Sequence, residues 1–221
     1  MALAAVFLAA AAAFFFVARP FLFRKHWDVV SIRQTREFQD AELLERAWRM
    51  PTAALYRHAG IAYQPNGSIC GPTSVANVMR SLGRQGETPR HVIAGTGLCS
   101  VNDFCMGGIT IEELAGLVRT KTGRRTTVLR DLSLDALRAE LVHVNDPSRR
   151  YIANFDRGPL FGTGGGHHSP VAAYLADEDL VLVIDVNRDF RPWLAKTARL
   201  RDAMNTPDTS TGRNRGLLRI E

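Results

Sequence analysis

Cysteine is scarce in this sequence, which limits what its thiols can do. Only three of the 221 residues are cysteines, at positions 70, 99 and 105. A structural zinc site takes four ligands, and the run around Cys99 and Cys105 offers no second pair nearby. We therefore predict no tightly bound metal or other cofactor. Three alternatives stay open for these two thiols: free thiols, a local disulfide in an oxidising compartment, or contacts with a soft metal.

The excess of positive over negative charge is also small. The net charge of +6 is spread along the chain, and no block of Lys and Arg alternates with aromatic residues. The pattern argues against a nucleic-acid partner and favours solubility and anionic ligands. Internal repeats and low-complexity segments are missing after the first 25 residues. With 46% apolar and 23% charged residues, the composition is that of an ordinary globular protein.

Charged residues are absent from Met1 to Ala18, a run at the lower limit of a membrane span. A signal peptide normally carries Lys or Arg before its apolar run, and a core helix has a polar stripe; this run has neither. We therefore predict a membrane anchor over residues 1–25 and one soluble domain over residues 26–221. The basic residues after Ala18 favour a cytoplasmic domain but leave the side open, and export to the periplasm is the alternative.

Periodicity and capping signals predict helices in the first half of that domain and strands in the second. The expected helices cover residues 38–50, 110–122 and a segment from Ser133. Thr110 and Glu113 form a capping box at the start of the second. The expected strands cover residues 126–129, 150–155, 169–175 and 180–186. This order predicts an α+β fold, with a helical half packed against an antiparallel sheet.

Cys70 lies where a turn gives way to an apolar helix, in "QPNGSICGPTSVANVMRSLG". Pro72 suits the first turn of a helix, and Gly83 closes it. The unpaired N–H groups and the dipole of a helix start favour an anion, so we expect the Cys70 thiol to lose its proton easily and to act as a nucleophile. The alternative is a small buried hydrophobic residue.

A base for this thiol lies in "GTGGGHHSPVAAYLADEDLVLVIDV". The midpoint between His167 and Asp185 falls at residue 176, inside a turn signal, so a hairpin would bring the two side chains together. His167 could then take the Cys70 proton while Asp185 fixes its tautomer. The alternative is a strand-end histidine and a capping aspartate. Gln64 could donate to an oxyanion beside the Cys70 N–H, or be a solvated loop residue.

The combination of "Q-x5-C-G-x-x-S", "G-H-x-S-P" and "D-V-x-R" resembles the catalytic domain of phytochelatin synthases, papain-like cysteine transpeptidases that act on glutathione. The resemblance runs from about residue 51 to the C-terminus. It implies a papain-like fold with Cys70 as nucleophile, His167 as base, Asp185 as its orienting group and Gln64 as oxyanion donor. It also implies that Arg188, Gly166 and Ser169 contact the substrate. His168 stands where the family commonly has an apolar or aromatic residue, so the pattern alone does not settle which histidine acts.

The chemistry implied by this resemblance is cleavage of the Cys–Gly bond of glutathione through a γ-Glu-Cys thioester. Water then yields γ-glutamylcysteine, or a second glutathione yields a phytochelatin. The chain ends soon after the catalytic domain, as in short bacterial members, for which hydrolysis is expected to dominate. Cd2+ or Zn2+ would arrive as glutathione thiolate complexes, and a homodimer is left open. The rival hypotheses are a papain-like peptidase that trims bacteriocin leaders, and an inactive, tethered thiol- or metal-binding protein.

Overall fold

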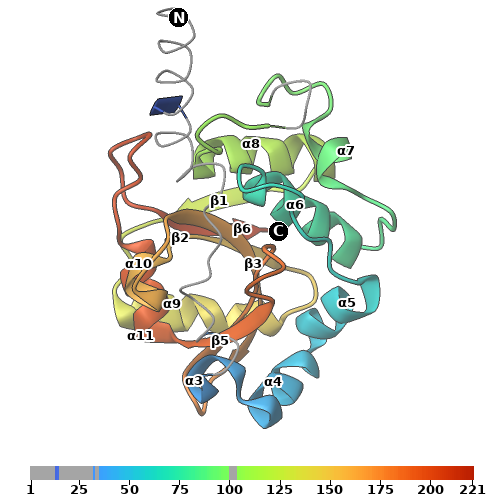
Figure 1. The fold of residues 1–221 in the computed structure, drawn as a ribbon. Coiled ribbons are helices and arrows are strands. Elements are labelled where there is room, and N and C mark those ends of the chain that lie inside the picture. Colours follow the sequence, from blue (N-terminus) through green and yellow to red (C-terminus); the bar gives the residue numbers. More distant parts are fainter. Residues whose placement is uncertain (1–12, 15–31, 33–34, 100–103) are drawn as a thin grey trace, which may run out of the picture.

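A single antiparallel sheet organises the molecule (Figure 1). The computed structural model describes residues 13–14, 32, 35–99 and 104–221. The sheet has the strand order β1-β6-β2-β3-β4-β5. Its strands are β1 (Thr126–Leu129), β2 (Arg150–Asp156), β3 (Gly166–Leu175), β4 (Leu180–Ile184), β5 (Pro192–Lys196) and β6 (Gly216–Ile220). Together with the helices described below, this sheet confirms the α+β prediction.

The first helices differ from the single helix predicted over residues 38–50. The chain forms α3 (Arg36–Gln39) and α4 (Ala41–Trp48), separated by Asp40. The Asp40 side chain accepts from the backbone N–H groups of Glu42 and Leu43, so it starts a new helix instead of continuing the first. Pro51 then opens a further helix, α5 (Pro51–Ala59), at a position where its missing N–H costs nothing.

The central helices follow the sequence signals closely. Helix α6 (Cys70–Ser81) begins at the cysteine, a short α7 (Pro89–Ile93) follows, and α8 (Ile111–Thr122) carries both hydrogen bonds of the predicted capping box. Helix α8 ends at Gly123 in the left-handed conformation. The prediction that helices begin at Cys70 and after Thr110 is therefore confirmed.

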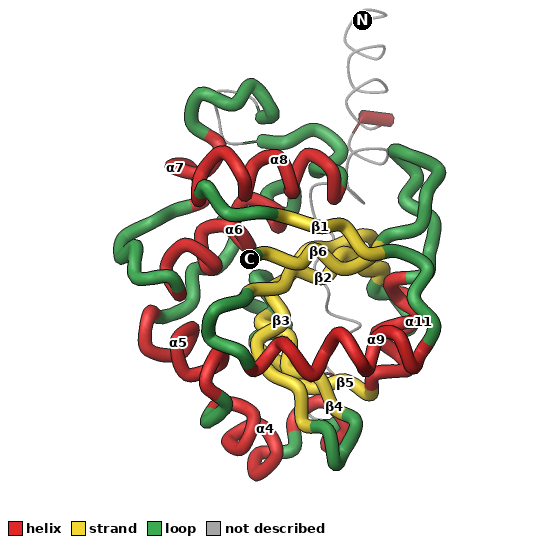
Figure 2. The backbone as a smooth tube through the Cα atoms, turned by 180° about the vertical axis from the view of Figure 1, so that it is seen from behind, coloured by secondary structure: helices red, strands yellow, loops and turns green. Residues whose placement is uncertain are grey.

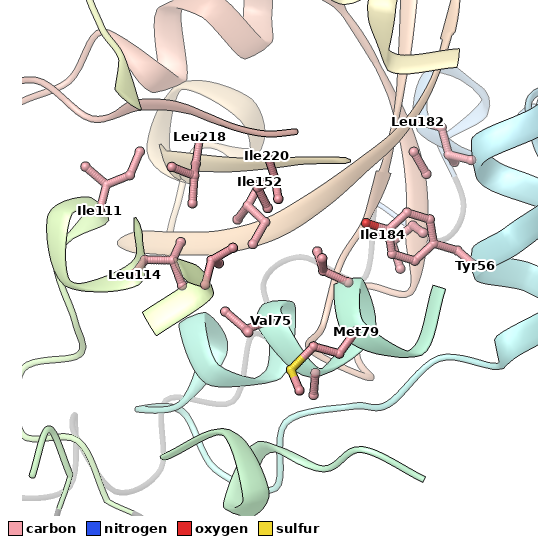
Figure 3. Packing of buried hydrophobic residues seen from close by; sticks show 14 of the residues in the cluster. Tyr56, Val75, Met79, Ile111, Leu114, Ile152, Leu182, Ile184, Leu218 and Ile220 are labelled. Carbon is pink, nitrogen blue, oxygen red and sulfur yellow. The ribbon is translucent and has the colours of Figure 1, made fainter. Parts of the chain in front are cut away.

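Helices cover both faces of the sheet. On one face α9 (Leu134–Leu141), the short helix η2 (Val142–Asn145), α10 (Gly158–Phe161) and α11 (Thr197–Met204) pack on a cluster that contains Phe155, Val183 and Trp193. Figure 2 shows α9 running across the strands on that side. On the other face α5, α6 and α8 enclose a second cluster, which contains Val75, Met79 and Ile152 (Figure 3). Side chains of successive residues along β4 alternate between the two clusters.

The pairing of β3 with its neighbours positions the residues of interest. Strand β3 pairs with β4 as the predicted hairpin, with Val171 opposite Val183. His167 lies at the start of β3, opposite Phe155 of β2. Asp185 follows the last residue of β4. The open end of the hairpin therefore holds both residues, as predicted. The register differs from the midpoint arithmetic, which would place residue 181 and not Val183 opposite Val171, and it shifts between Val171 and Ala173.

Strands β5 and β6 have no counterpart in the sequence prediction. Strand β5 pairs with β4 at one edge of the sheet, and β6 lies between β1 and β2. The predicted anchor lies outside the described residues, apart from residues 13–14. In the part of the chain that is described, no helix combines the length and apolar character needed to span a membrane.

Candidate active site

Cys70 is the first residue of α6 and lies against the start of β3. Cys70 is buried, with 7% of its surface exposed. The Ser74 hydroxyl donates to the backbone oxygen of Cys70, at 2.8 Å, and lies 3.0 Å from that of His168. Ser74 therefore connects the first turn of the helix to the strand that carries both histidines. This connection sets the position of the thiol relative to the sheet.

The thiol is not the ready anion that its place at a helix start suggests. Burial raises the pKa of Cys70, and this outweighs the N–H groups of His168 and Gly71 and the positive charge of Arg157, which lower it. The sequence-based expectation of an easily ionised thiol is therefore wrong. The helix start acts in the expected direction, but removal from water has the larger effect.

His167 and Asp185 form a buried pair. The Nε2 of His167 lies 2.9 Å from Oδ1 of Asp185, and the residues are 3% and 0% exposed. A carboxylate only accepts, so Nε2 carries the hydrogen and Nδ1 is left as the basic nitrogen of the neutral ring. Phe155 packs edge-on against this ring, with 5.6 Å between centroids.

The Asp185 carboxylate accepts from several further donors. Arg157 Nη2 lies 2.8 and 2.9 Å from its two oxygens, Trp193 Nε1 lies 3.1 Å from Oδ2, and the N–H of Asn187 lies 2.9 Å from Oδ1. Burial works to raise the pKa of Asp185, but Arg157 and His167 together hold it well below its usual range. The carboxylate is therefore fixed and negatively charged.

The two neighbouring histidines have different partners. Burial lowers the pKa of both rings to about 4, so both are neutral near pH 7. His168 points its Nε2 at the backbone oxygen of Ile109, at 2.9 Å. His167 is thus the histidine that the structure pairs with Asp185, as the sequence reasoning chose. His168 instead attaches β3 to the segment before α8.

A cavity of about 150 Å3 opens at this point. The residues that line it are Cys70, Gly107, Gly108, Ile109, Asn154, Gly166, His167, His168, Asp208, Thr209, Ser210 and Arg215. Three buried polar atoms of this lining have no hydrogen-bond partner among the described residues: Nδ2 of Asn154, Nε of Arg215 and Nδ1 of His168. Buried polar groups are normally paired, so these atoms indicate a polar ligand.

Arg215 brings a positive charge to this cavity, which Asp208 also lines. Arg215 is 7% exposed, and its Nη1 donates to the backbone oxygens of Thr206 and Pro207. Its nearest carboxylate is Asp156, 3.9 Å from Nη2. This ion pair is a long one, and Nε of Arg215 has no hydrogen-bond partner among the described residues, so the site favours an anionic ligand group.

The other predicted site residues are placed less directly. Gly166 lines the cavity, and a Cβ there would come within 2.6 Å of the Arg215 guanidinium. Ser169 is buried, and its hydroxyl accepts from the Val186 N–H at 3.4 Å, beside Asp185. The lining of the cavity contains Gly166 but not Ser169.

Gln64 and Arg188 lie outside the lining of the cavity, on two segments that contact each other. The Gln64 N–H donates to the Val186 oxygen at 2.8 Å, which holds this residue beside the strand end that carries Asp185. Arg188 is exposed and stacks over the Tyr63 ring at 5.2 Å. Their roles in catalysis and substrate binding remain predictions.

Cys99 and Cys105 form a disulfide, which resolves the three alternatives left by the sequence. The Cys105 N–H donates to the hydroxyl of Ser68, two residues before Cys70, at 3.1 Å. Gly107 and Gly108, which line the cavity, follow this cysteine directly. The disulfide therefore anchors one wall of the cavity.

Sequence reasoning missed Arg157, Trp193, Asn154 and Arg215. Arg157 follows the apolar strand 150–155 by two residues, just as Asp185 follows another apolar strand. The argument that a buried carboxylate needs a partner could have pointed to this opposite charge. For Trp193, Asn154 and Arg215 we find no comparable signal in the sequence, because their place depends on strand pairing.

The comparisons with known proteins agree with this geometry. A model of the phytochelatin synthase family matches residues 35–217. The chain belongs to the phytochelatin synthase family. It is 45% identical over 74 residues to glutathione gamma-glutamylcysteinyltransferase 3 of Lotus japonicus, a match that covers 33% of the chain and 15% of that protein. The glutathione gamma-glutamylcysteinyltransferase of Schizosaccharomyces pombe is 29% identical over 125 residues, covering 55% of the chain and 30% of that protein.

In both comparisons the matched segment covers less than a third of the relative's length. Among solved structures, the peptidase domain of Streptococcus ComA, a bifunctional ABC transporter, is similar with a TM-score of 0.49 and 15% identity. That match covers 73% of the chain and 96% of the peptidase domain. A likeness this remote carries no argument about activity.

Proposed function

We propose that this phytochelatin synthase family member is a thiol-dependent acyl transferase that cleaves the Cys–Gly amide of glutathione. The observation that carries the proposal is the cavity lined by both Cys70 and His167, with the far nitrogen of His167 held by Asp185. A nucleophile, a base and an orienting carboxylate are the groups that acyl transfer needs. The names of the relatives support glutathione as the substrate.

The first step starts from a neutral pair. Because burial raises the pKa of Cys70 and lowers that of His167, the thiol keeps its proton until the substrate is in place. Nδ1 of His167 takes this proton while the sulfur attacks the cysteinyl carbonyl carbon of glutathione. The imidazolium then gives the proton to the departing glycine nitrogen. The Cys–Gly bond is broken, and a γ-glutamylcysteinyl thioester remains on Cys70.

The second step resolves the thioester. Water or the α-amino group of a second glutathione attacks the thioester carbon, His167 takes one proton from it, and the Cys70 thiol leaves with that proton. Water gives γ-glutamylcysteine, and glutathione gives a phytochelatin. We propose hydrolysis as the main outcome, with Gln64 and the Cys70 N–H as oxyanion donors.

The γ-glutamyl end of glutathione carries a free α-amino and a free α-carboxylate group. Arg215 and Asp208 both line the cavity and offer one charge of each sign. The unpartnered Nε of Arg215 and Nδ2 of Asn154 are donors suited to a carboxylate. We propose that these residues, together with Gly166, hold the acyl half of the substrate. Arg188 and Ser169 stay secondary proposals.

The decisive experiment exposes the full-length chain to glutathione briefly and measures its intact mass together with the glycine released. We expect a γ-glutamylcysteinyl adduct on native protein and none on Cys70→Ala. Arg215→Lys should raise KM for glutathione about tenfold, because a lysine cannot present the same planar fork. Absence of glycine release, with cleavage of a Gly-Gly leader peptide instead, would favour the peptidase hypothesis and reject this one.

Three further proposals concern partners. Cd2+ or Zn2+ would arrive bound to the glutathione thiolate, since thiolates are soft ligands, and adding either ion with substrate should change the rate if this is so. The apolar run in residues 1–25 supports attachment to a membrane, which flotation with lipid vesicles would test. A homodimer is tested by light scattering of the purified chain.

A further inference from the structure

We propose that Arg157 is a positioning residue of this active site: its guanidinium fixes the Asp185 carboxylate and cancels its charge, so that His167 meets Cys70 as a neutral base. The proposal rests on the proposed roles of Cys70 and His167 as nucleophile and base. It adds a fourth residue to the triad, and this residue does not line the substrate cavity.

The first support is the geometry of the pair. Nη2 of Arg157 contacts both oxygens of Asp185, at 2.8 and 2.9 Å, and the two residues are 4% and 0% exposed. Neither charge reaches water, so each depends on the other for compensation. Trp193, His167 and the N–H of Asn187 contact the same carboxylate. The carboxylate therefore has little freedom to rotate away from the histidine.

The second support is the way the chain holds Arg157 itself. The guanidinium carbon lies 4.0 Å from the centre of the Phe190 ring. The Cβ of Arg157 lies against Gly164, which has φ +118°: a Cβ at Gly164 would lie only 2.6 Å from it. The Arg157 N–H also donates to the Gly165 oxygen at 3.2 Å. The "GTGGG" run is thus shaped to let this arginine lie beneath it.

The third support is electrostatic. The titratable and charged groups around the His167 ring are Asp185 after β4, Arg157 after β2, Cys70 on α6 and His168 on β3. Asp185 alone would favour an imidazolium. Arg157 opposes it and, like burial, lowers the pKa of His167. The arginine also helps to lower the pKa of Cys70 against the effect of burial.

Arg150 provides a matched control. It is also a buried arginine, 1% exposed, and is the first residue of β2, the strand that Arg157 directly follows. Its guanidinium bonds the hydroxyl and the backbone oxygen of Ser81, at 2.7 and 2.9 Å, at the other end of α6. Loss of Arg150 should therefore reduce stability without changing the titration of His167.

The test follows the ring signals of isotope-labelled His167 by NMR across pH in the full chain, together with the pH dependence of Cys70 alkylation by iodoacetamide. Neither measurement requires turnover of glutathione, so failure of the proposed function would not be confused with failure of this inference. In Arg157→Met the titration midpoint of His167 should rise by about one pH unit or more, because the Asp185 charge is no longer cancelled. Arg150→Met should leave the midpoint in place.

A second variant decides the matter if Arg157→Met does not fold. Arg157→Lys keeps the charge but contacts the carboxylate at one point only. We expect it to leave the midpoint of His167 low and to reduce kcat/KM about tenfold or more, with the loss in kcat and little change in KM. Gly164→Ala, which displaces Arg157 without removing it, should act in the same direction. Native kinetics in Arg157→Lys, or a midpoint shift of equal size in Arg150→Met, would overturn the proposal.

Discussion

The replacement Asp185→Asn probes the triad and the core at the same time. The carboxylate accepts five contacts, two from Arg157 and one each from His167, Trp193 and the N–H of Asn187. An asparagine has a single oxygen, so its NH2 group must face donors that a carboxylate satisfied. It also leaves the Arg157 guanidinium buried with no anion. These two losses fix the expected size of the effect.

Removal of one partner of a buried ion pair costs about 3–5 kcal/mol of unfolding free energy. For a domain of this size each kcal/mol shifts Tm by roughly 2–4 °C, so Tm should fall by about 6–20 °C. The activity should fall more steeply. In a Ser-His-Asp triad the same exchange lowers kcat about 10,000-fold because the histidine adopts the wrong tautomer, and a loss of about 1,000-fold or more is expected here.

The assay is glycine release from glutathione under saturating substrate, with thermal unfolding followed by circular dichroism on the same samples. Asp189→Asn is the control, because Asp189 is an exposed carboxylate four residues further along the same loop. It should leave both values near native. If Asp185→Asn kept its activity within tenfold of native and its Tm within a few degrees, the argument that this carboxylate orients the base would be refuted.

Three other predictions follow from the same structure. Gly71→Ala places a Cβ 2.6 Å from Cδ1 of Ile109 in the cavity wall, so KM for glutathione should rise and the free energy of unfolding should fall by about 1–3 kcal/mol. Native values in steady-state kinetics and in thermal melting would contradict this prediction. After denaturation, the chain should take up one alkyl group without reductant and three after reduction, and three groups without reductant would disprove the disulfide. Loss of the Cys99–Cys105 bond should lower the free energy of unfolding by about 2 kcal/mol. The two buried histidines of β3 have pKa values lowered to about 4, so the unfolded chain binds more protons between pH 4 and 6.5. Stability should therefore be complete above about pH 6.5 and fall toward pH 4, and a Tm that does not change across this range would argue against their burial.

Local signals in the sequence were sufficient for several elements. The capping box of α8, the proline in the first turn of α6 and the glycines that end both helices act through neighbouring residues, so the chain alone specifies them. The hairpin of β3 and β4 belongs to the same class, because its turn sets the register. The presence of His167 and Asp185 at the same open end followed from that hairpin, although its register differs from the one that the sequence predicts.

Other elements could not be read locally. Asp40 divides one apolar period into two helices, a competition that periodicity does not reveal. Strands β5 and β6 are defined by the neighbours they pair with, and residues such as Asn154 and Arg215 reach the cavity only through that pairing. The state of the Cys70 thiol also depended on tertiary structure, because the depth of burial outweighed the local effect of the helix start.

The sequence by itself was thus sufficient to select Cys70, His167 and Asp185 as the candidate nucleophile, base and orienting carboxylate, since each belongs to a short segment with its own conformational preference. Only the tertiary structure decided what surrounds them. The buried arginine behind Asp185, the disulfide beside the cavity and the neutral state of the Cys70–His167 pair arise where segments distant in the chain exclude water from one another. Charge in such a place is governed by desolvation and by its nearest partners, and both are properties of the folded chain.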